Sequence, residues 1–463
     1  MITQDWNQVL DSIPPNAPEP IVSAHFVKPL LEALGFSKEE QYPQFKTSQG
    51  GNSVDFAARN NCNDDVSFLF SPVNPYLLVE VKGRAIISGG TINLSEGTPQ
   101  YLSAKEQIKR YLLSPNCKTA QWGIITNSNH IQLFRRHGKV VFPATPSLLI
   151  KKDNIREIVA NIKTLIENTQ KALTVCLYND KGGVGKTTTT INLATTLRLQ
   201  KKKVLVVDFD PQQRDLTDSL GLDTGEVKLS NCLIDKNLDI FKTVQSFKVK
   251  NRTNQEVNLF DVIPSDPDLE KFMNHDEQAK VQKRSARLRD LLKKLAHHYD
   301  YILIDSPTNW TFFSQSCVFA SDIVLIPTKH DNFAAIKNAK KVIKQFIPEV
   351  QELRNKLCGD AGAIALPIFF NEHKPTDASI QKTHNEIKDL LTIKATNKLA
   401  WDTELLPYFY PKARKGNFNT DIFSIPDYAV ISSAAFSRTP AVLKHKTISE
   451  HYLNLAKEYF LYE

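Results

Sequence analysis

The chain has 463 residues, 41% of them hydrophobic and 23% charged, which is the composition of an ordinary globular protein and suggests roughly two to four domains. The formal net charge of +8 permits a polyanionic partner without requiring one. The six cysteines form no C-x-x-C pair, which argues against zinc ribbons and redox motifs. No apolar run approaches the roughly 18 residues of a spanning helix, and residues 1–20 lack a signal-peptide pattern. We therefore expect a cytoplasmic protein with no membrane contact.

The N-terminal third predicts a helix and two strands that carry ionisable side chains. Apolar residues at helical spacing indicate a helix over residues 20–34, ended by a glycine. Strands are expected over residues 54–56 and 76–82. Side chains alternate along a strand, so Glu80 and Lys82 share one face. A mostly apolar strand that points a carboxylate and an ammonium group the same way suggests a functional role.

Phosphodiester cleavage is one reaction that would use these groups. Asp55 and Glu80 offer hard oxygen ligands for Mg²⁺. Lys82 would stabilise the negative charge that develops on the phosphate. The alternative is a surface ion pair between Glu80 and Lys82, which is common on edge strands.

The surrounding residues resemble a known nuclease domain. Asp55 followed by Glu80-x-Lys82 looks like the PD-(D/E)xK nuclease core. Further segments resemble the N-terminal nuclease domain of type I restriction R subunits: Glu19, Phe26-x-x-Pro29-Leu30-Leu31-x-x-Leu34-Gly35, Val54-Asp55, Leu78-Val79-Glu80-Val81-Lys82, Gln107-x-x-x-Tyr111 and Trp122-Gly123-Ile124-Ile125-Thr126-Asn127.

That resemblance implies a restriction-endonuclease-like domain over residues 1–152. It implies that Glu19, Asp55 and Glu80 bind Mg²⁺ and that Asp55, Glu80 and Lys82 act in cleavage. It also marks Gln107 as a motif residue. Inactive DNA-binding or partner-binding relatives of this fold exist, so a catalytically silent module stays open as an alternative.

A helical pattern separates this domain from the rest of the chain. Apolar residues at helical spacing begin at Ile155 and predict a connecting helix within residues 153–173. The second domain is then expected over residues 174–463.

A glycine-rich stretch at the start of the second domain predicts a phosphate-binding loop. An apolar strand over residues 173–178 precedes it, and a helix over residues 191–199 follows. Glycines let backbone N–H groups turn towards phosphate oxygens, and the positive end of the helix adds to the same anion site. Lys186 would reach the β- and γ-phosphates of a nucleotide, and the Thr187 hydroxyl would ligate Mg²⁺.

This stretch resembles the deviant Walker A box of the ParA/MinD family. Asp180 stands where the general pattern has its first glycine, and Lys181 follows it. In that family the early lysine reaches across a dimer to the nucleotide of the partner. The resemblance assigns nucleotide binding to Lys181, Gly182, Gly183, Val184, Gly185, Lys186, Thr187 and Thr188.

Further buried strands follow and end in acidic residues. The strand over residues 203–212 ends in D-x-D-P-Q, which resembles the second motif of the family and places Asp210 beside the γ-phosphate, the attacking water and Mg²⁺. The strand over residues 301–307 looks like a Walker B strand, whose Asp305 helps to hold Mg²⁺. In the residues after both motifs the sequence departs from its relatives.

Two later strands complete the expected sheet. They cover residues 321–327 and 361–370, and Pro367 should end or kink the second one because proline cannot donate to the ladder. Asn371 follows, where relatives place residues near the adenine base. The alternation of strands and helices predicts an α/β fold: a P-loop NTPase parallel sheet with helices on both faces, plus a smaller N-terminal α/β restriction-nuclease-like domain.

The C-terminal region resembles the ParA ending and carries two basic clusters. Such residues would contact DNA phosphates in a salt-dependent way, although a solvated charged loop is an equal alternative. The candidate DNA-binding residues are Lys412, Arg414, Lys415, Lys444 and Lys446.

Together the motifs predict a ParA-type ATPase that hydrolyses ATP to ADP and phosphate with Mg²⁺. By resemblance it would form ATP-dependent homodimers, bind DNA non-specifically at the nucleoid, and position a cargo (a plasmid, a chromosome region or a protein compartment such as a carboxysome), stimulated by an adaptor protein. Lys181 and Asp210 would be its catalytic residues. The alternative is an ATP-regulated, Mg²⁺-dependent DNA nuclease of a restriction or defence system.

Overall fold

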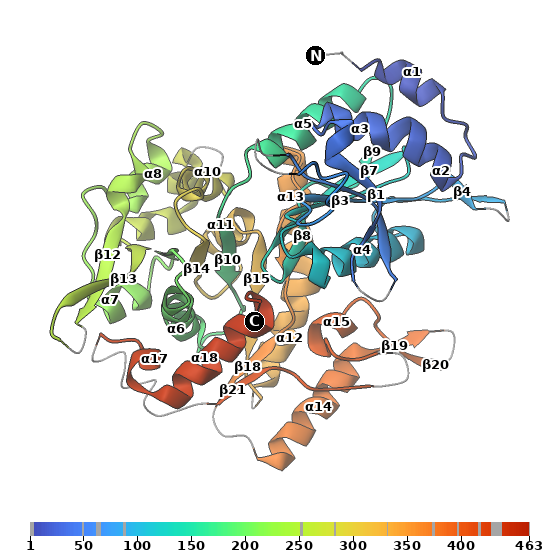
Figure 1. Cartoon of the computed structure of the whole chain (residues 1–463). Helices are drawn as coiled ribbons and strands as arrows, with labels where there is room; N and C mark the ends of the chain where they lie inside the picture. Colours follow the sequence, from blue (N-terminus) through green and yellow to red (C-terminus); the bar gives the residue numbers. More distant parts are fainter. Residues whose placement is uncertain are drawn as a thin grey trace. The chain divides into compact units, whose positions relative to one another are not determined.

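The chain forms two compact units, Met1–Thr169 with Cys358–Ala361, and Gln170–Leu357 with Gly362–Glu463 (Figure 1). The computed structural model describes residues 4–462 except 49–50, 62–65, 87–88, 251–252, 282–283, 331, 373–375, 396–397, 415–417 and 427–437. Among the described residues, no helix is both long and apolar enough to cross a membrane.

The first unit is built on a mixed sheet in the order β1-β2-β3-β6-β7-β8, with β9 paired to β7. β3 and β6 run parallel, and the other neighbours run antiparallel. Its strands are β1 (Gln41–Lys46), β2 (Ser53–Ala58), β3 (Leu77–Val81), β6 (Trp122–Thr126), β7 (His130–His137), β8 (Val140–Pro143) and β9 (Leu148–Leu149), with a separate hairpin of β4 (Ala85–Ile86) and β5 (Gly90–Thr91). Its helices are α1 (Trp6–Asp11), α2 (Glu19–Val22), the π-helical turn η1 (Ser23–Val27), α3 (Lys28–Ala33), α4 (Pro99–Leu112) and α5 (Ile155–Glu167).

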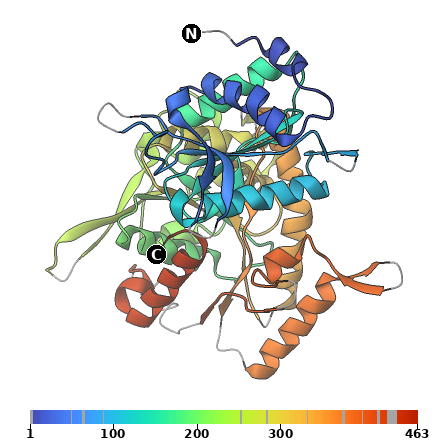
Figure 2. The ribbon, with the colours of Figure 1, turned by 45° about the vertical axis from the view of Figure 1, so that its right-hand side comes forward.

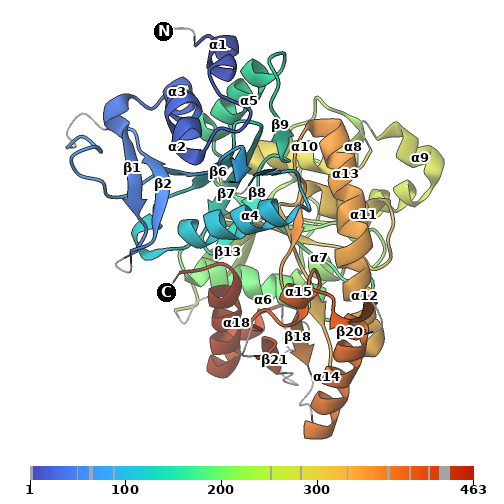
Figure 3. The ribbon, with the colours of Figure 1, turned by 90° about the vertical axis from the view of Figure 1, so that its right-hand side faces the viewer.

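Helices cover both faces of this sheet. On β3, Leu77, Val79 and Val81 belong to the apolar core shared with α1–α3 and α5. Leu78 lies on the opposite face, in the core shared with α4. Figure 3 shows α4 along one side of the strands and α2 and α3 along the other. The alternation of side chains therefore puts Glu80 on the same face as Leu78.

The expected connecting helix is part of the first unit. Ile155, Ile158, Ile162 and Ile166 of α5 are buried in the same core as α3 and β3. Apolar residues at helical spacing give α5 one buried stripe, so packing against the sheet accounts for the pattern. The two units meet in sequence between Thr169 and Gln170.

The second unit has a central sheet in the order β12-β13-β11-β14-β10-β15-β17. All neighbours are parallel except β12 and β13, whose hairpin extends beyond the rest of the unit, in yellow-green in Figure 2. The strands are β10 (Leu173–Leu177), β11 (Val204–Asp208), β12 (Gln245–Lys250), β13 (Glu256–Ile263), β14 (Tyr301–Asp305), β15 (Ile323–Leu325) and β17 (Ile364–Ala365). Every residue of β10, β11 and β14 is buried, as expected for a sheet covered on both faces. The α/β prediction for this part of the chain is confirmed.

Pro367 divides the expected last strand. β17 ends at Ala365, and β18 begins at Phe369 and pairs in a separate small sheet. Proline has no N–H for the ladder, so the strand stops there, as predicted. That small sheet contains β16 (Pro327–Thr328), β18 (Phe369–Glu372) and β21 (Ser424–Pro426); a further hairpin is formed by β19 (Thr392–Ala395) and β20 (Lys398–Trp401).

Helices complete the second unit. One of them, α6, follows the glycine-rich loop and packs against α18. The main helices are α6 (Lys186–Leu199), α7 (Asp215–Leu220), α8 (Leu229–Ile234), α9 (His275–Lys280), α10 (Ala286–Leu295), α11 (Phe312–Ala320), α12 (Phe333–Lys341), α13 (Ile347–Cys358), α14 (Asp377–Leu391), α15 (Leu406–Phe409), α17 (Ala441–Lys444) and α18 (Lys446–Tyr459), with the short turns η4 (Ile240–Thr243), η5 (Pro267–Met273) and η6 (Val342–Phe346).

Candidate functional sites

The glycine-rich loop of the second unit connects the end of β10 to the start of α6. Gly183 and Gly185 adopt φ angles of +71° and +83°, which are left-handed and favour glycine. Nothing lies within 4 Å of a Cβ placed on Gly183. Gly185 directly precedes α6 as its N-cap. The loop therefore has the backbone conformation, and at Gly183 the open space, that a bound phosphate needs at a helix N-terminus.

Lys186 lies beside this loop among several carboxylates. It is 8% exposed, and its Nζ lies 3.5 Å from the backbone oxygen of Lys181. Burial lowers the pKa of Lys186, while the negative charges of Asp305 and Asp210 oppose that shift. The structure thus brings together three predicted site residues from three different strand ends.

Asp305 lies at the end of β14, and one of its carboxylate oxygens makes no hydrogen bond to the described atoms. It is 3% exposed, and among the described atoms its Oδ1 has no hydrogen-bond partner. Burial, and then the charge of Asp208, raise the pKa of Asp305 to about 8, whereas Thr187 and Lys186 act to lower it. A buried oxygen without a partner requires an explanation. A hard cation such as Mg²⁺ between Asp305 and the Thr187 hydroxyl fits this donor set.

Asp210 lies in the turn that follows β11. Its Oδ1 accepts the backbone N–H groups of Gln212 and Gln213 at 3.0 and 3.1 Å. The neighbouring Asp208 is fully buried, and its Oδ2 accepts both the N–H and the hydroxyl of Thr217, at 2.9 and 2.7 Å. Burial raises the pKa of Asp208 to about 6. Asp208 therefore fixes the segment that positions Asp210.

Asp208 was not among the predicted site residues. The D-x-D spacing shows two aspartates, but their different roles depend on Thr217, which is nine residues away from Asp208 in sequence and touches it only in the fold.

Lys181 and Asn371 lie at opposite extremes of exposure in this site. Lys181 is exposed at the start of the loop, where its side chain is accessible to another molecule. Asn371, on β18, is 9% exposed, and its Nδ2 donates to Val184 O at 3.2 Å and to Thr189 Oγ1 at 3.4 Å. A Cβ on Gly185 would lie 1.9 Å from that Nδ2. The structure therefore places Asn371 directly on the glycine-rich loop, and its predicted role near adenine stays a prediction.

The basic residues expected to contact DNA lie on separate elements. Lys412 and Arg414 are exposed, and Arg414 donates to the backbone oxygens of Pro411 and Ala413 at 2.9 Å. Lys444 ends α17, and the Lys446 side chain, at the start of α18, is 91% exposed. Lys415 lies outside the described residues.

A second cluster of ionisable groups lies in the first unit. Asp55 on β2, Glu80 on β3, Lys82 just after β3 and Glu19 at the start of α2 affect one another electrostatically. Glu80 is 2% exposed; burial, and then the charge of Asp55, raise its pKa to about 7. Burial and Asp55 also raise the pKa of Glu19. The structure thus brings together the four residues for which metal binding or cleavage is predicted.

Protein groups already bond both carboxylate oxygens of Asp55 and one of Glu80. Lys82 Nζ forms an ion pair with Glu80 Oε1. Asp55 Oδ2 accepts Val81 N–H at 2.7 Å, and its Oδ1 accepts Gln44 Nε2 at 3.1 Å. Among the described residues, no group of three or more His, Cys, Asp and Glu side chains is arranged to hold a metal ion as it stands. The donor set suits Mg²⁺, but Lys82 would have to release Glu80 first.

A close backbone approach brings Glu19 to the end of β3. A Cβ on Gly83 would lie 3.2 Å from both Glu19 N and Ala17 O, so a larger residue would push these segments apart. Arg84 N donates to Ala17 O, and its guanidinium donates to Ile13 O, each at 2.8 Å. These bonds hold the segment before α2 against the strand.

Two further side chains bear on this cluster. Gln107, on α4, donates to Tyr111 Oη at 2.9 Å, so its contribution to cleavage stays a prediction. Gln44 was not predicted, yet it donates directly to Asp55. No sequence pattern identifies it, because the contact depends on the register of β1 against β2.

Residues 172–358 match the family model described as an AAA domain. A chromosome partitioning protein ParA of Myxococcus xanthus is 35% identical over 170 residues, covering 35% of this chain and 53% of that protein. The sporulation initiation inhibitor protein Soj of Bacillus subtilis is 34% identical over 160 residues, covering 35% of this chain and 59% of that protein.

The chain thus spans between half and three-fifths of the length of these relatives. A solved structure of a Cyanothece McdA variant in complex with ATP is 22% identical and covers 64% of this chain and 98% of its own, with a TM-score of 0.46. Residues 172–358 thus match an AAA domain, and part of the chain is similar in sequence to ParA and Soj proteins.

Proposed function

We propose that the second unit is a ParA-type ATPase that binds ATP with Mg²⁺ and hydrolyses it as a homodimer. The observation that carries this proposal is the site around Lys186, where a buried ammonium group and Asp305 Oδ1, which has no partner among the described atoms, lie beside a left-handed glycine loop that is open at Gly183. Such a site is incomplete without an anion for the lysine and a cation for the carboxylate. ATP with Mg²⁺ supplies both.

Each residue of the site has a role in this proposal. The backbone N–H groups of residues 182–188 and the Lys186 ammonium hold the phosphates. Thr187 and Asp305 hold the metal, which neutralises charge on the phosphates when bound. Asp210 orients the attacking water and contributes to the metal site. Lys181, exposed on the loop, reaches the nucleotide of a second copy.

The biological output in this proposal is the positioning of a cargo on DNA. The ATP-bound dimer would contact DNA phosphates non-specifically through Lys412, Arg414, Lys415, Lys444 and Lys446, and so associate with the nucleoid. An adaptor protein would stimulate hydrolysis and release the dimer. The relatives named as chromosome partitioning and sporulation proteins support this class of role.

Retardation of DNA on a gel tests this proposal. Purified chain is mixed with a duplex of random sequence, with ATP, with ADP or without nucleotide. The proposal predicts retardation only with ATP, and its loss in Lys186→Ala. Equal retardation in all three conditions would refute nucleotide control of DNA binding.

The cluster of Glu19, Asp55, Glu80 and Lys82 favours a second candidate function, Mg²⁺-dependent cleavage of DNA. Three carboxylates in a partly buried site repel one another, which is one cause of the raised pKa of Glu80 after burial. A divalent cation would relieve that repulsion. The metal, when bound, would polarise the phosphate and activate water, and Lys82, released from Glu80, would stabilise the departing charge.

Supercoiled plasmid incubated with Mg²⁺ tests this second function, with and without ATP. Nicking or linearisation that disappears in Glu80→Ala would show a nuclease under ATP control. Intact DNA in both proteins would mean that the cluster is catalytically silent.

A further inference from the structure

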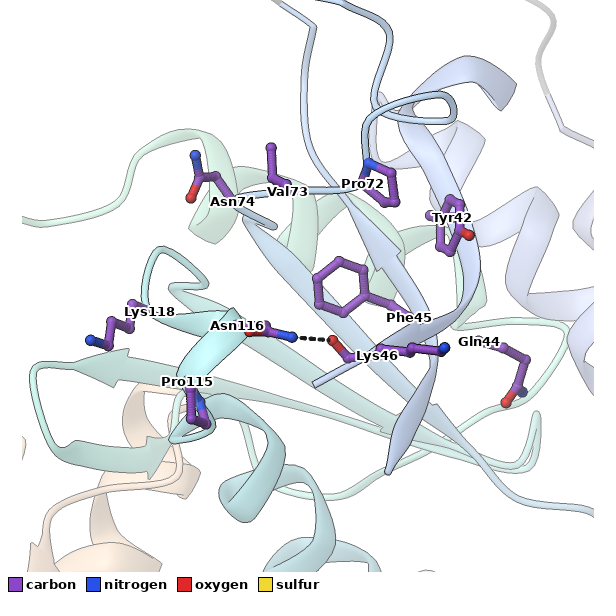
Figure 4. A pocket seen from close by; sticks show the side chains of 10 residues that line it. All are labelled: Tyr42, Gln44, Phe45, Lys46, Pro72, Val73, Asn74, Pro115, Asn116 and Lys118. Carbon is purple, nitrogen blue, oxygen red and sulfur yellow. Dashed lines mark hydrogen bonds between the residues drawn. The ribbon is translucent and has the colours of Figure 1, made fainter. Parts of the chain in front are cut away.

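A pocket of about 610 Å³ opens in the first unit between β1, the loop before β3 and the turn after α4 (Figure 4). This volume lies within the range of small-molecule binding sites. The pocket is lined by Tyr42, Gln44, Phe45, Lys46, Pro72, Val73, Asn74, Pro115, Asn116 and Lys118.

The lining has the chemistry of a site for a nucleotide. It contains two lysines, three carboxamides and two aromatic rings, and none of its residues is acidic. Lysines bind phosphate oxygens. Carboxamides both donate to and accept from the edges of bases. Aromatic rings and prolines offer flat apolar surfaces against which a base can pack.

The pocket is built by specific contacts. In Figure 4 the ring of Phe45 lies at its centre, between Pro72 and Asn116. That ring packs on Tyr42, edge to face, with centroids 6.4 Å apart. Asn116 Nδ2 donates to Lys46 O at 3.0 Å and so joins the turn after α4 to β1.

Gln44 links this pocket to the carboxylate cluster. It lines the pocket, and its Nε2 donates to Asp55 Oδ1 at 3.1 Å. Its Oε1 accepts the Ser53 hydroxyl at 2.9 Å. Gln44 adopts a φ of +51°, an uncommon conformation for a residue with a Cβ, and the two bonds help to hold it there. A ligand in the pocket therefore lies one side chain away from Asp55.

We propose that this pocket binds an unpaired nucleotide of a single-stranded DNA segment and so presents an adjacent phosphodiester to Asp55, Glu80 and Lys82. The proposal rests on the second function proposed above, that of a nuclease. Lys46 and Lys118 contact the phosphates of the strand, and Asn74 and Asn116 contact the base, while the Gln44 amide keeps its bonds to Asp55 and Ser53. An unpaired base is required because the edge of a paired base inside a duplex does not enter a pocket of this kind.

Fluorescence anisotropy with a labelled single-stranded DNA oligonucleotide tests the proposal. The full chain is used with EDTA and without nucleotide, so that neither cleavage nor the ATP-dependent state contributes. The test variant is Lys46→Ala/Lys118→Ala, in which both side chains are exposed. Its matched control is Lys28→Ala/Lys151→Ala, which removes the same charge from exposed positions of the same unit.

The proposal predicts about tenfold weaker binding in the test variant and near wild-type binding in the control. The slope of log affinity against log salt is negative, and it should become less steep by about 1.4 in the test variant, because two phosphate contacts of a single strand are lost. Equal affinities in the two double variants would overturn the proposal. Displacement of the oligonucleotide by polyglutamate as effectively as by unlabelled DNA would also overturn it, because the pocket would then bind any polyanion.

The experiments distinguish a wrong assignment of the pocket from a wrong assignment of nuclease activity. The anisotropy experiment contains no metal, so a chain that binds the oligonucleotide through Lys46 and Lys118 but leaves single-stranded circular DNA intact with Mg²⁺ keeps the pocket and loses the nuclease. A chain that cuts the single-stranded circle with unchanged efficiency in Lys46→Ala/Lys118→Ala keeps the nuclease and loses the pocket.

Discussion

Replacing Gly185 by alanine should destabilise the second unit more than the same change at Gly183. Both glycines have positive φ, so alanine costs about 1–2 kcal/mol at either position. Only at Gly185 does the new Cβ meet a neighbour, Asn371 Nδ2, at 1.9 Å. That amide must turn away and lose its bonds to Val184 and Thr189, which contribute about 0.5–1.5 kcal/mol each.

The predicted difference between the two variants is therefore about 1–3 kcal/mol. Urea unfolding of the nucleotide-free chain measures this difference in the free energy of unfolding. The transition of the second unit is identified as the one that ATP shifts in the wild type. Gly183→Ala is the matched control because nothing lies within 4 Å of its added Cβ. Equal destabilisation of both variants, within about 0.5 kcal/mol, would refute the assigned contact between Asn371 and the loop.

Three further predictions concern the two sites. Lys186→Ala should lose detectable ATP binding in calorimetric titration, because the ammonium facing the phosphates is gone; unchanged affinity would contradict its placement. Lys181→Ala should bind ATP normally yet remain monomeric in size-exclusion chromatography and inactive, because this exposed side chain acts on the partner; wild-type turnover would count against a dimeric site. Mg²⁺ should bind the first unit more tightly at pH 8 than at pH 6, because the pKa of Glu80 is raised to about 7 and its proton must leave before a metal binds. Isothermal titration of Asp305→Asn, which removes the proposed metal-binding carboxylate of the second unit, measures this; affinity independent of pH, or unchanged by adding Glu80→Gln, would exclude Glu80 as a ligand.

The sequence predicted those parts of the structure that depend on local pattern. Buried apolar runs predicted β10, β11 and β14, and the absence of an N–H in Pro367 predicted the break between β17 and β18. The spacing of the glycines predicted the loop before α6. In these cases the residues that determine the structure lie within a few positions of one another.

Contacts between distant segments could not be predicted in this way. Asn371 reaches the loop at Val184 from 187 residues away. Gln44 reaches Asp55 because β1 pairs with β2 in a particular register. The helix expected as a linker packs in the first unit, since its periodicity indicates a buried face but not which surface buries it.

The rate of ATP hydrolysis as a function of chain concentration, with Mg²⁺ and DNA present, distinguishes a dimeric ATPase from a monomeric one. We expect turnover per chain to rise with concentration as dimers form, and Lys186→Ala to have no turnover. Turnover per chain that stays constant over a thousandfold range, or that does not exceed the level of Lys186→Ala, would contradict a ParA-type dimeric ATPase.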